Sequence, residues 1–155
     1  MPGRWWSTEM GDVLLVGLDI NQLEKPEQLA WLEQTLAASD APWKIVGTHQ
    51  SPYSAGYQGS GEVVREDYVP IFEEYGVQLV LSGHDHDYQR STVMNGVTYI
   101  VSGGAAGIRR TGSERYTAYS ASTPHFVDLN VFSDRLVLRA VDHDLRMFDE
   151  VVIPL

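Results

Sequence analysis

Trp43-Lys44-Ile45-Val46-Gly47-Thr48 and Val77-Gln78-Leu79-Val80-Leu81 are the two apolar runs that decide the fold. Each has the length and the β-branched content of a buried strand. Between them, residues 50–61 predict a loop rich in Ser, Gly and Tyr, and a helix follows over about 64–75. A strand, a helix and a second strand in this order form the crossover that joins two parallel strands. We therefore expect a parallel sheet at the centre of the molecule.

The same alternation extends toward the N-terminus. Residues 12–19 form a continuous apolar run bounded by aspartates, typical of an interior strand that is buried on both faces. A helix is expected to open at 25–28, with Pro26 in its first turn and an acidic residue near the positive end of its dipole. Its apolar side chains recur at helical spacing. They are Leu29, Trp31, Leu32 and Leu36.

The second half of the chain predicts antiparallel strands. Asn95-Gly96, between the runs 88–94 and 97–102, is a strong signal for a two-residue hairpin turn. Three further runs continue as a meander with short polar turns, at 127–132, 135–141 and 147–153. The stretch 103–123 is expected to be one long functional or mobile loop. The fold class is therefore α/β (α+β), a layered β-sandwich with helices in which parallel strands come first.

Composition and charge exclude several classes of function. A chain of 155 residues with 43% apolar residues can build a core without disulfide bonds or a structural zinc ion, so a single domain over 1–155 is expected. The absence of cysteine excludes thiolate nucleophiles, cysteine-ligated zinc and iron–sulfur clusters. A net charge of −10 disfavours binding to nucleic acid. No apolar run reaches membrane-spanning length, and residues 1–6 lack the core of a signal peptide, so we expect a soluble protein without a membrane partner.

Three of the five histidines follow the two central strands. His84 and His86 are two residues apart, and in extended chain they project to the same side at a spacing of about 6.6 Å. His49 follows the other strand. Because ligand sites lie beyond the carboxyl ends of strands in open α/β sheets, all three are expected at one edge. Neutral imidazoles suit zinc or another transition ion rather than calcium or magnesium.

The remaining candidates have two interpretations each. Asp85 and Asp87 are candidate catalytic residues, either as further metal ligands or as hydrogen-bond partners of the histidines, but acids in an acidic protein are often simply solvated. Tyr53, Tyr88 and Arg90 are the candidate substrate-binding residues, because arginine matches phosphate oxygens; packing and solvation are the alternatives. Tyr57 is a further candidate for lining a substrate cleft, and Arg109 and Arg110 are further candidates for holding an anionic group, with the same alternatives.

Two other features argue against competing sites. His125, next to Phe126, is expected to be a packed or hydrogen-bonded histidine rather than a ligand. Gly59-Ser60-Gly61 has the wrong spacing and context for the nucleophile turn of a serine hydrolase.

Two blocks of sequence carry a family resemblance. Residues 48–54 (Thr48-His49-Gln50-Ser51-Pro52-Tyr53-Ser54) and 83–90 (Gly83-His84-Asp85-His86-Asp87-Tyr88-Gln89-Arg90) resemble the last two metal-binding blocks of the calcineurin-like metallophosphoesterases, especially the purple acid phosphatases. The resemblance implies that His49 and His84 bind one metal and His86 another. It further implies a dinuclear site where a metal-bound hydroxide attacks phosphorus.

The chain also departs from the family pattern. The earlier blocks, DxH, GDxxx and GNH, have no equivalent in residues 1–48, and Gln89 replaces the usual glutamate. We therefore expect a truncated domain corresponding to the carboxyl-terminal half of the family domain. Its metal would be a single zinc, manganese or iron ion held by His49, His84 and His86, with water or a neighbouring carboxylate completing the shell.

The expected function is metal-dependent hydrolysis of phosphate esters, both monoesters and diesters, extending to activated carboxyl or organophosphate esters. The alternative is a non-catalytic metal-binding or oligomerising fragment. A third interpretation is a truncated gene product whose full-length form has the missing ligands. An uncovered sheet edge favours association, so a homodimer or larger oligomer is expected.

Overall fold

The computed structural model describes residues 5–155, and its secondary structure falls into ten strands and four helical segments within that range. The strands are β1 (Trp6–Met10), β2 (Val13–Gly17), β3 (Trp43–Gly47), β4 (Leu79–Ser82), β5 (Tyr88–Ser91), β6 (Thr98–Ser102), β7 (Thr117–Ala121), β8 (His125–Val131), β9 (Arg135–Asp142) and β10 (Met147–Pro154). The helical segments are the 3₁₀ turn η1 (Ile20–Gln22), α1 (Pro26–Ala38), the π-helical turn η2 (Val64–Tyr68) and α2 (Val69–Glu74).

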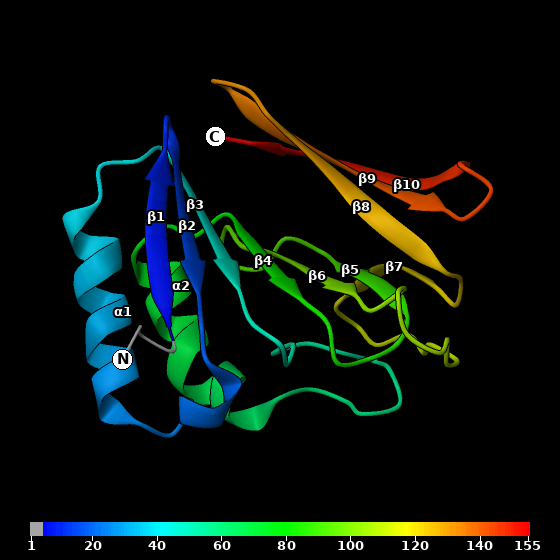
Figure 1. The fold of residues 1–155 in the computed structure, drawn as a ribbon, viewed down its shortest axis with the longest axis horizontal. Coiled ribbons are helices and arrows are strands. Elements are labelled where there is room, and N and C mark those ends of the chain that lie inside the picture. The colour runs from blue at the N-terminus through cyan, green and yellow to red at the C-terminus, as the bar shows by residue number, and fades with distance from the viewer. Residues whose placement is uncertain (1–4) are drawn as a thin grey trace.

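The elements form three layers. A seven-stranded sheet has the order β1-β2-β3-β4-β6-β5-β7, and a three-stranded sheet has the order β10-β9-β8. The helices cover one face of the large sheet and the small sheet covers the other (Figure 1). Successive side chains of β3 enter the two cores in turn, since Val46 packs with the helices and Ile45 packs with the small sheet. The predicted layered sandwich is confirmed.

The central strands have the predicted directions. β2, β3 and β4 are parallel neighbours, and β6 joins β4 in parallel as well. β5 and β6 form the predicted antiparallel hairpin. Its turn residues Asn95 and Gly96 have φ of 48° and 88°, as the favoured two-residue hairpin turn requires.

The predicted second helix is present but irregular. It begins as the π-helical turn η2 and continues as α2. Pro70 lies at the junction, and it has no N–H to donate to the carbonyl four residues earlier. The first helix, α1, begins at Pro26 as expected.

Two strands were not predicted from the sequence. β1 pairs with β2 through a turn at Gly11, and all five of its residues are exposed, so it shows no alternation of apolar and polar side chains. β7 lies inside the stretch 103–123, where only loop was expected, and it pairs with β5. That expectation was wrong because an edge strand of mostly small residues that are half-exposed or exposed has no hydrophobic pattern.

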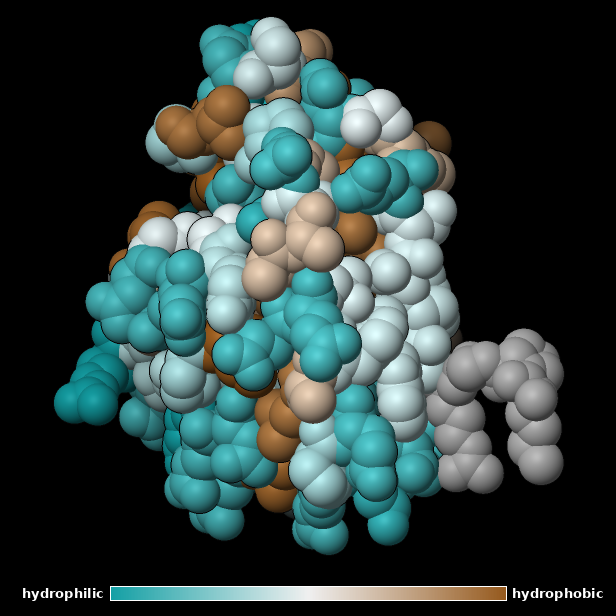
Figure 2. Space-filling view, turned by 90° about the vertical axis from the view of Figure 1, so that its left-hand side faces the viewer, coloured by the Kyte–Doolittle hydropathy of each residue, from teal (hydrophilic) through white to brown (hydrophobic). Residues whose placement is uncertain are grey.

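The edge of the large sheet differs from expectation, because β1 covers the outer edge of the parallel strand β2. β1 is therefore one edge of the large sheet, and β7 is the other. The side of the molecule that carries α1 is mostly hydrophilic or neutral, and hydrophobic side chains show in a narrow central band and in a small patch near the top (Figure 2). Oligomerisation stays a prediction. Light scattering of the full chain in solution would test it by measuring the mass of the particle. None of the helices between residues 5 and 155 is long and apolar enough to cross a membrane.

Candidate functional site

The carboxyl ends of β3 and β4 bring two histidines together. The strands are parallel neighbours, and backbone pairing continues beyond their ends: the N–H of Gly83 donates to the carbonyl of His49 over 3.0 Å. His49 and His84 each follow two residues after a strand end. The two ring nitrogens, His49 Nε2 and His84 Nδ1, are 3.0 Å apart. The structure therefore places this pair at one edge of the sheet, as the topology predicts.

The third histidine lines the same hollow. The hollow has a volume of about 390 Å³ and is lined by all three imidazoles together with Gln58 and the loop that follows β6. His86 Nδ1 lies 2.9 Å from the carbonyl oxygen of Gly107. Because a carbonyl only accepts, this nitrogen carries the proton, and the Nε2 of His86 keeps its lone pair free.

The backbone at His84 is unusual. Its φ is 66°, in the left-handed region that a non-glycine residue rarely adopts. The following turn packs against Gly103 so closely that a Cβ there would lie 1.9 Å from the carbonyl oxygen of Asp85. Gly103 thus allows the histidine loop and the loop after β6 to approach each other.

The surroundings of His49 favour its neutral form, although the residue is largely exposed. Its pKa is lowered by burial first, and then by the neighbouring His84 and His86, whose positive charges would repel its own. A neutral imidazole is the form that binds a metal ion.

The donor set fits a transition metal. Within residues 5–155, no three histidine or acidic side chains converge tightly enough to form a ready-made metal cluster. However, the 3.0 Å between His49 Nε2 and His84 Nδ1 is close to the separation of about 3.4 Å that two nitrogens have on one tetrahedral zinc ion. One of these nitrogens donates a hydrogen bond to the other. Its proton would have to move to the second nitrogen of the same ring, by a change of tautomer, before both nitrogens could bind one cation.

Asp85 does not line the hollow. Its carboxylate is only 2% exposed and accepts hydrogen bonds from the Ser54 hydroxyl and, over 2.7 Å, from the N–H of Gln58. Both donors belong to the loop after β3. In the structure this candidate catalytic carboxylate holds that loop in place instead of facing the hollow.

Asp87 is buried in the same network at 1% exposure, away from the hollow. The amide nitrogen of Gln89 donates to both of its oxygens over 3.0 and 3.1 Å, and to Ser54 Oγ over 2.9 Å. The N–H of Ala55 donates to Gln89 Oε1 over 2.7 Å. Burial raises the pKa of Asp87 against the lowering effect of the hydrogen bonds from Gln89 and Thr111.

The expected substrate contacts of Tyr88 and Arg90 are replaced by structural ones. Tyr88 is fully buried, and its hydroxyl donates to Asp149 Oδ2 over 2.7 Å. Arg90 binds both oxygens of Asp149, over 2.7 and 2.8 Å. The two residues share one face of β5, since side chains alternate along a strand, and that face points toward the small sheet. They join β5 to β10.

Tyr53 is also placed elsewhere. Its ring packs on those of Tyr99 and Tyr116, at centroid distances of 4.8 and 5.3 Å. Burial raises the pKa of Tyr53. None of the three candidate substrate-binding residues lines the histidine hollow.

His125 packs as expected. Its Nδ1 donates to the carbonyl of Thr123 over 2.8 Å, so its Nε2 accepts from the Ser102 hydroxyl over 3.1 Å. Its ring lies edge-on to those of Tyr88 and Phe148.

Sequence reasoning missed Gln58 and the loop after β6 as lining residues of the hollow. The long stretch 103–123 was a signal for the loop, because long ordered loops are often functional. Gln58 gave no signal of its own.

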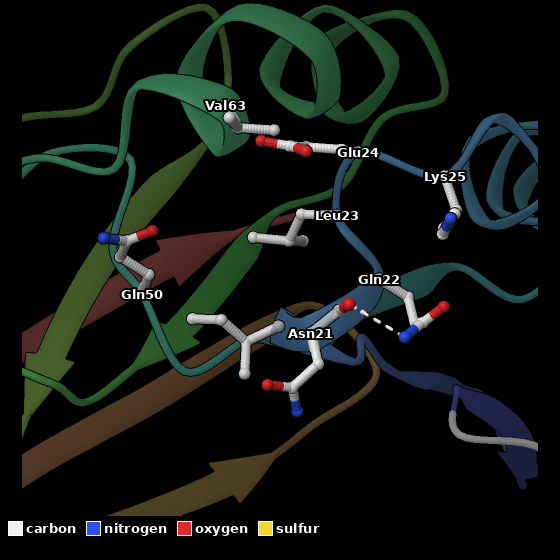
Figure 3. A pocket seen from close by; sticks show the side chains of 8 residues that line it. Asn21, Gln22, Leu23, Glu24, Lys25, Gln50 and Val63 are labelled. Carbon is white, nitrogen blue, oxygen red and sulfur yellow. Dashed lines mark hydrogen bonds between the residues drawn. The ribbon is translucent and has the colours of Figure 1, made fainter.

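A second hollow, of about 310 Å³, adjoins the segment around η1 (Figure 3). Gln50, which follows His49, contributes to its wall with Val63 and residues 20–25. The one hydrogen bond drawn there runs from Gln22 to the carbonyl of Asn21 over 2.8 Å. This hollow has no histidine and brings together no chemically reactive set of side chains.

The chain is similar in sequence to one protein family and to several individual proteins. The family model for calcineurin-like phosphoesterases matches residues 9–88, which include His49, His84 and His86. An acid phosphatase from Aspergillus ficuum is 37% identical over 86 residues, covering 54% of this chain and 14% of its own length. Tartrate-resistant acid phosphatase type 5 from Rattus norvegicus is 36% identical over 76 residues, with coverages of 49% and 23%. The chain thus spans less than a quarter of the length of these relatives.

Solved structures share the fold. A purple acid phosphatase from yellow lupin seeds superimposes with a TM-score of 0.88 at 23% identity, covering 97% of this chain and 32% of its own. GAP50, described as the anchor in the inner membrane complex of Plasmodium, superimposes with a TM-score of 0.87 at 16% identity, with coverages of 100% and 56%.

Proposed function

We propose, from the premise that this chain belongs to the calcineurin-like phosphoesterase family, that it hydrolyses phosphate esters at the hollow lined by His49, His84 and His86. The observation that carries the proposal is the approach of His49 Nε2 and His84 Nδ1 to 3.0 Å beyond adjacent parallel strands. The third imidazole lines the same hollow.

The proposed cofactor is a single divalent transition ion, zinc, manganese or iron, held by the three histidines. When bound, such an ion acts as a Lewis acid that polarises the phosphoryl oxygen and activates water near neutral pH. The hydrogen bond of His86 Nδ1 to Gly107 fixes the ring so that its Nε2 faces away from the loop as a ligand. The lowered pKa of His49 favours the unprotonated form of that ligand.

The other polar groups have supporting roles in this proposal. Gln58 lines the hollow and offers both a donor and an acceptor to the ester. Asp85 acts as a positioning residue, because its carboxylate accepts a hydrogen bond from the N–H of Gln58. Phosphomonoesters are the proposed main substrates, with diesters and activated carboxyl or organophosphate esters as further ones.

Turnover of p-nitrophenyl phosphate tests the proposal. The zinc- or manganese-loaded chain should hydrolyse this ester, and chelation should abolish the activity. His84→Ala and His86→Ala should each lower kcat/KM at least about a hundredfold. His143→Ala is the matched control, because His143 is 65% exposed in a turn far along the chain, and its loss should change nothing. Unchanged turnover in either of the first two variants would refute the proposal.

A second candidate function is non-catalytic metal binding or assembly. The fold that the chain shares with GAP50, a protein described as an anchor, favours the assembly role. Stoichiometric metal binding without turnover of phosphate or carboxylate esters would support this candidate over hydrolysis.

A further inference from the structure

A third hollow, next to the histidines, has a different chemistry. It has a volume of about 490 Å³ and is lined by Tyr57, Arg109 and Arg110. Tyr57 is 77% exposed, which is unusual for so large an aromatic side chain. The guanidinium carbon of Arg109 lies 5.0 Å from the centre of the Tyr57 ring, within the range of a cation–π contact.

Both sides of this hollow are attached to the histidine site. Tyr57 precedes Gln58, which lines the histidine hollow and whose N–H is held by Asp85. On the other side, the N–H of Arg109 donates to the carbonyl of His86 over 3.0 Å. The backbone segment that positions Tyr57 therefore also positions Gln58. The segment that positions Arg109 is hydrogen-bonded to the proposed ligand His86.

The charges of this hollow are open to a ligand. Within residues 5–155, neither Arg109 nor Arg110 forms an ion pair, although the chain has a net charge of −10. Exposed guanidinium groups bind anions through paired donors, and they stack on flat rings. A flat group that carries or adjoins a negative charge satisfies both features.

We infer that the hollow of Tyr57, Arg109 and Arg110 binds the leaving group of an aromatic phosphate ester while its phosphate occupies the histidine hollow. The aromatic ring of the ester stacks on Tyr57, and the two arginines attract the negative charge that this ring carries or adjoins. An alkyl leaving group gains no stacking. The inference rests on the proposed function, and it adds the substrate class.

Binding of two non-hydrolysable phosphonates tests the inference without turnover. Benzylphosphonate and butylphosphonate have the same charge, but only the first has a ring. Calorimetry with the metal-loaded full chain should show a preference of about three- to tenfold for benzylphosphonate. Tyr57→Ala should abolish the preference, and Tyr57→Phe should keep it. Because Tyr57 is exposed, both variants should fold, as circular dichroism verifies.

Three results would overturn the inference: equal affinities in the wild-type chain, no binding of either phosphonate, or a preference that survives in Tyr57→Ala. Its failure is separable from that of the proposed function. Ester hydrolysis without a ring preference contradicts only the subsite. A ring preference without hydrolysis of any ester leaves the subsite standing and contradicts the hydrolase.

Discussion

At the scale of single residues, Gln89 explains one departure from the family pattern. Its amide nitrogen donates to Asp87 and to Ser54, and its amide oxygen accepts from the N–H of Ala55. A glutamate at this position would lose the donor and face the Asp87 carboxylate. The amide therefore matches the buried acid beside it.

Gln89→Glu should lower the free energy of unfolding by about 2 kcal/mol at pH 7, because it removes these hydrogen bonds and adds a like charge. Burial already raises the pKa of Asp87, so the charged pair is costliest at high pH, and the deficit should shrink as pH falls and the carboxyls protonate. Urea unfolding between pH 8 and pH 5 measures this.

Gln34→Glu, on the exposed face of α1, is the matched control and should change the free energy of unfolding by less than about 0.5 kcal/mol. If Gln89→Glu is as stable as the wild-type chain at pH 7, the described role of the amide is wrong.

At the scale of elements, the sequence patterns predicted interior strands better than edge strands. The runs within 12–19 and 43–48 are mostly apolar because each strand has one buried face and a second face that is at least half-buried, and the Asn95-Gly96 turn has its own chemical signal. β1 and β7 lie at the two edges of the large sheet, where exposed side chains remove that pattern.

The same reasoning explains which site residues were predictable. The histidines follow strand ends, and topology alone places them at one edge. Tyr88 and Arg90 were expected at the substrate. The alternation of side chains along a strand predicts that the two share a face, but it does not predict which face of the sheet that is. Only the docking of the small sheet, with Asp149 on β10, shows that they point away.

The Tyr88–Arg90–Asp149 cluster should join the two sheets energetically. Burial alone would raise the pKa of Asp149, but hydrogen bonds from Arg90 and Tyr88 outweigh it, and the pKa lies below its usual value of 3.8. Asp149→Asn should cost about 3 kcal/mol of stability at neutral pH. A carboxyl with a depressed pKa stabilises the fold above its unfolded pKa, so the difference from wild type should vanish as pH falls through the lower folded value.

Urea unfolding from pH 7 to pH 3 checks this prediction. Glu150→Gln is the control on the same strand. Its ion pair with Arg139 is exposed, and its loss should cost less than about 1 kcal/mol. Equal losses in the two variants would show that the buried cluster contributes no more than a surface pair.

At the scale of the whole molecule, both hydrophobic cores rest on the one seven-stranded sheet. We therefore propose that residues 1–155 act as one domain. The histidine hollow lies at the carboxyl edge of that sheet, and the hollow with Tyr57 and Arg109 lies beside it. In a chain with a net charge of −10, Arg109, Arg110 and any bound cation would form a local positive region that attracts phosphate.

The metal content of the purified chain tests the central claim most directly. After zinc loading and removal of free ions, elemental analysis should find one ion per wild-type chain. His84→Ala should retain almost none, and His143→Ala should retain as much as wild type. Equal metal content in wild type and His84→Ala, or no retained metal in either, would contradict the three-histidine site.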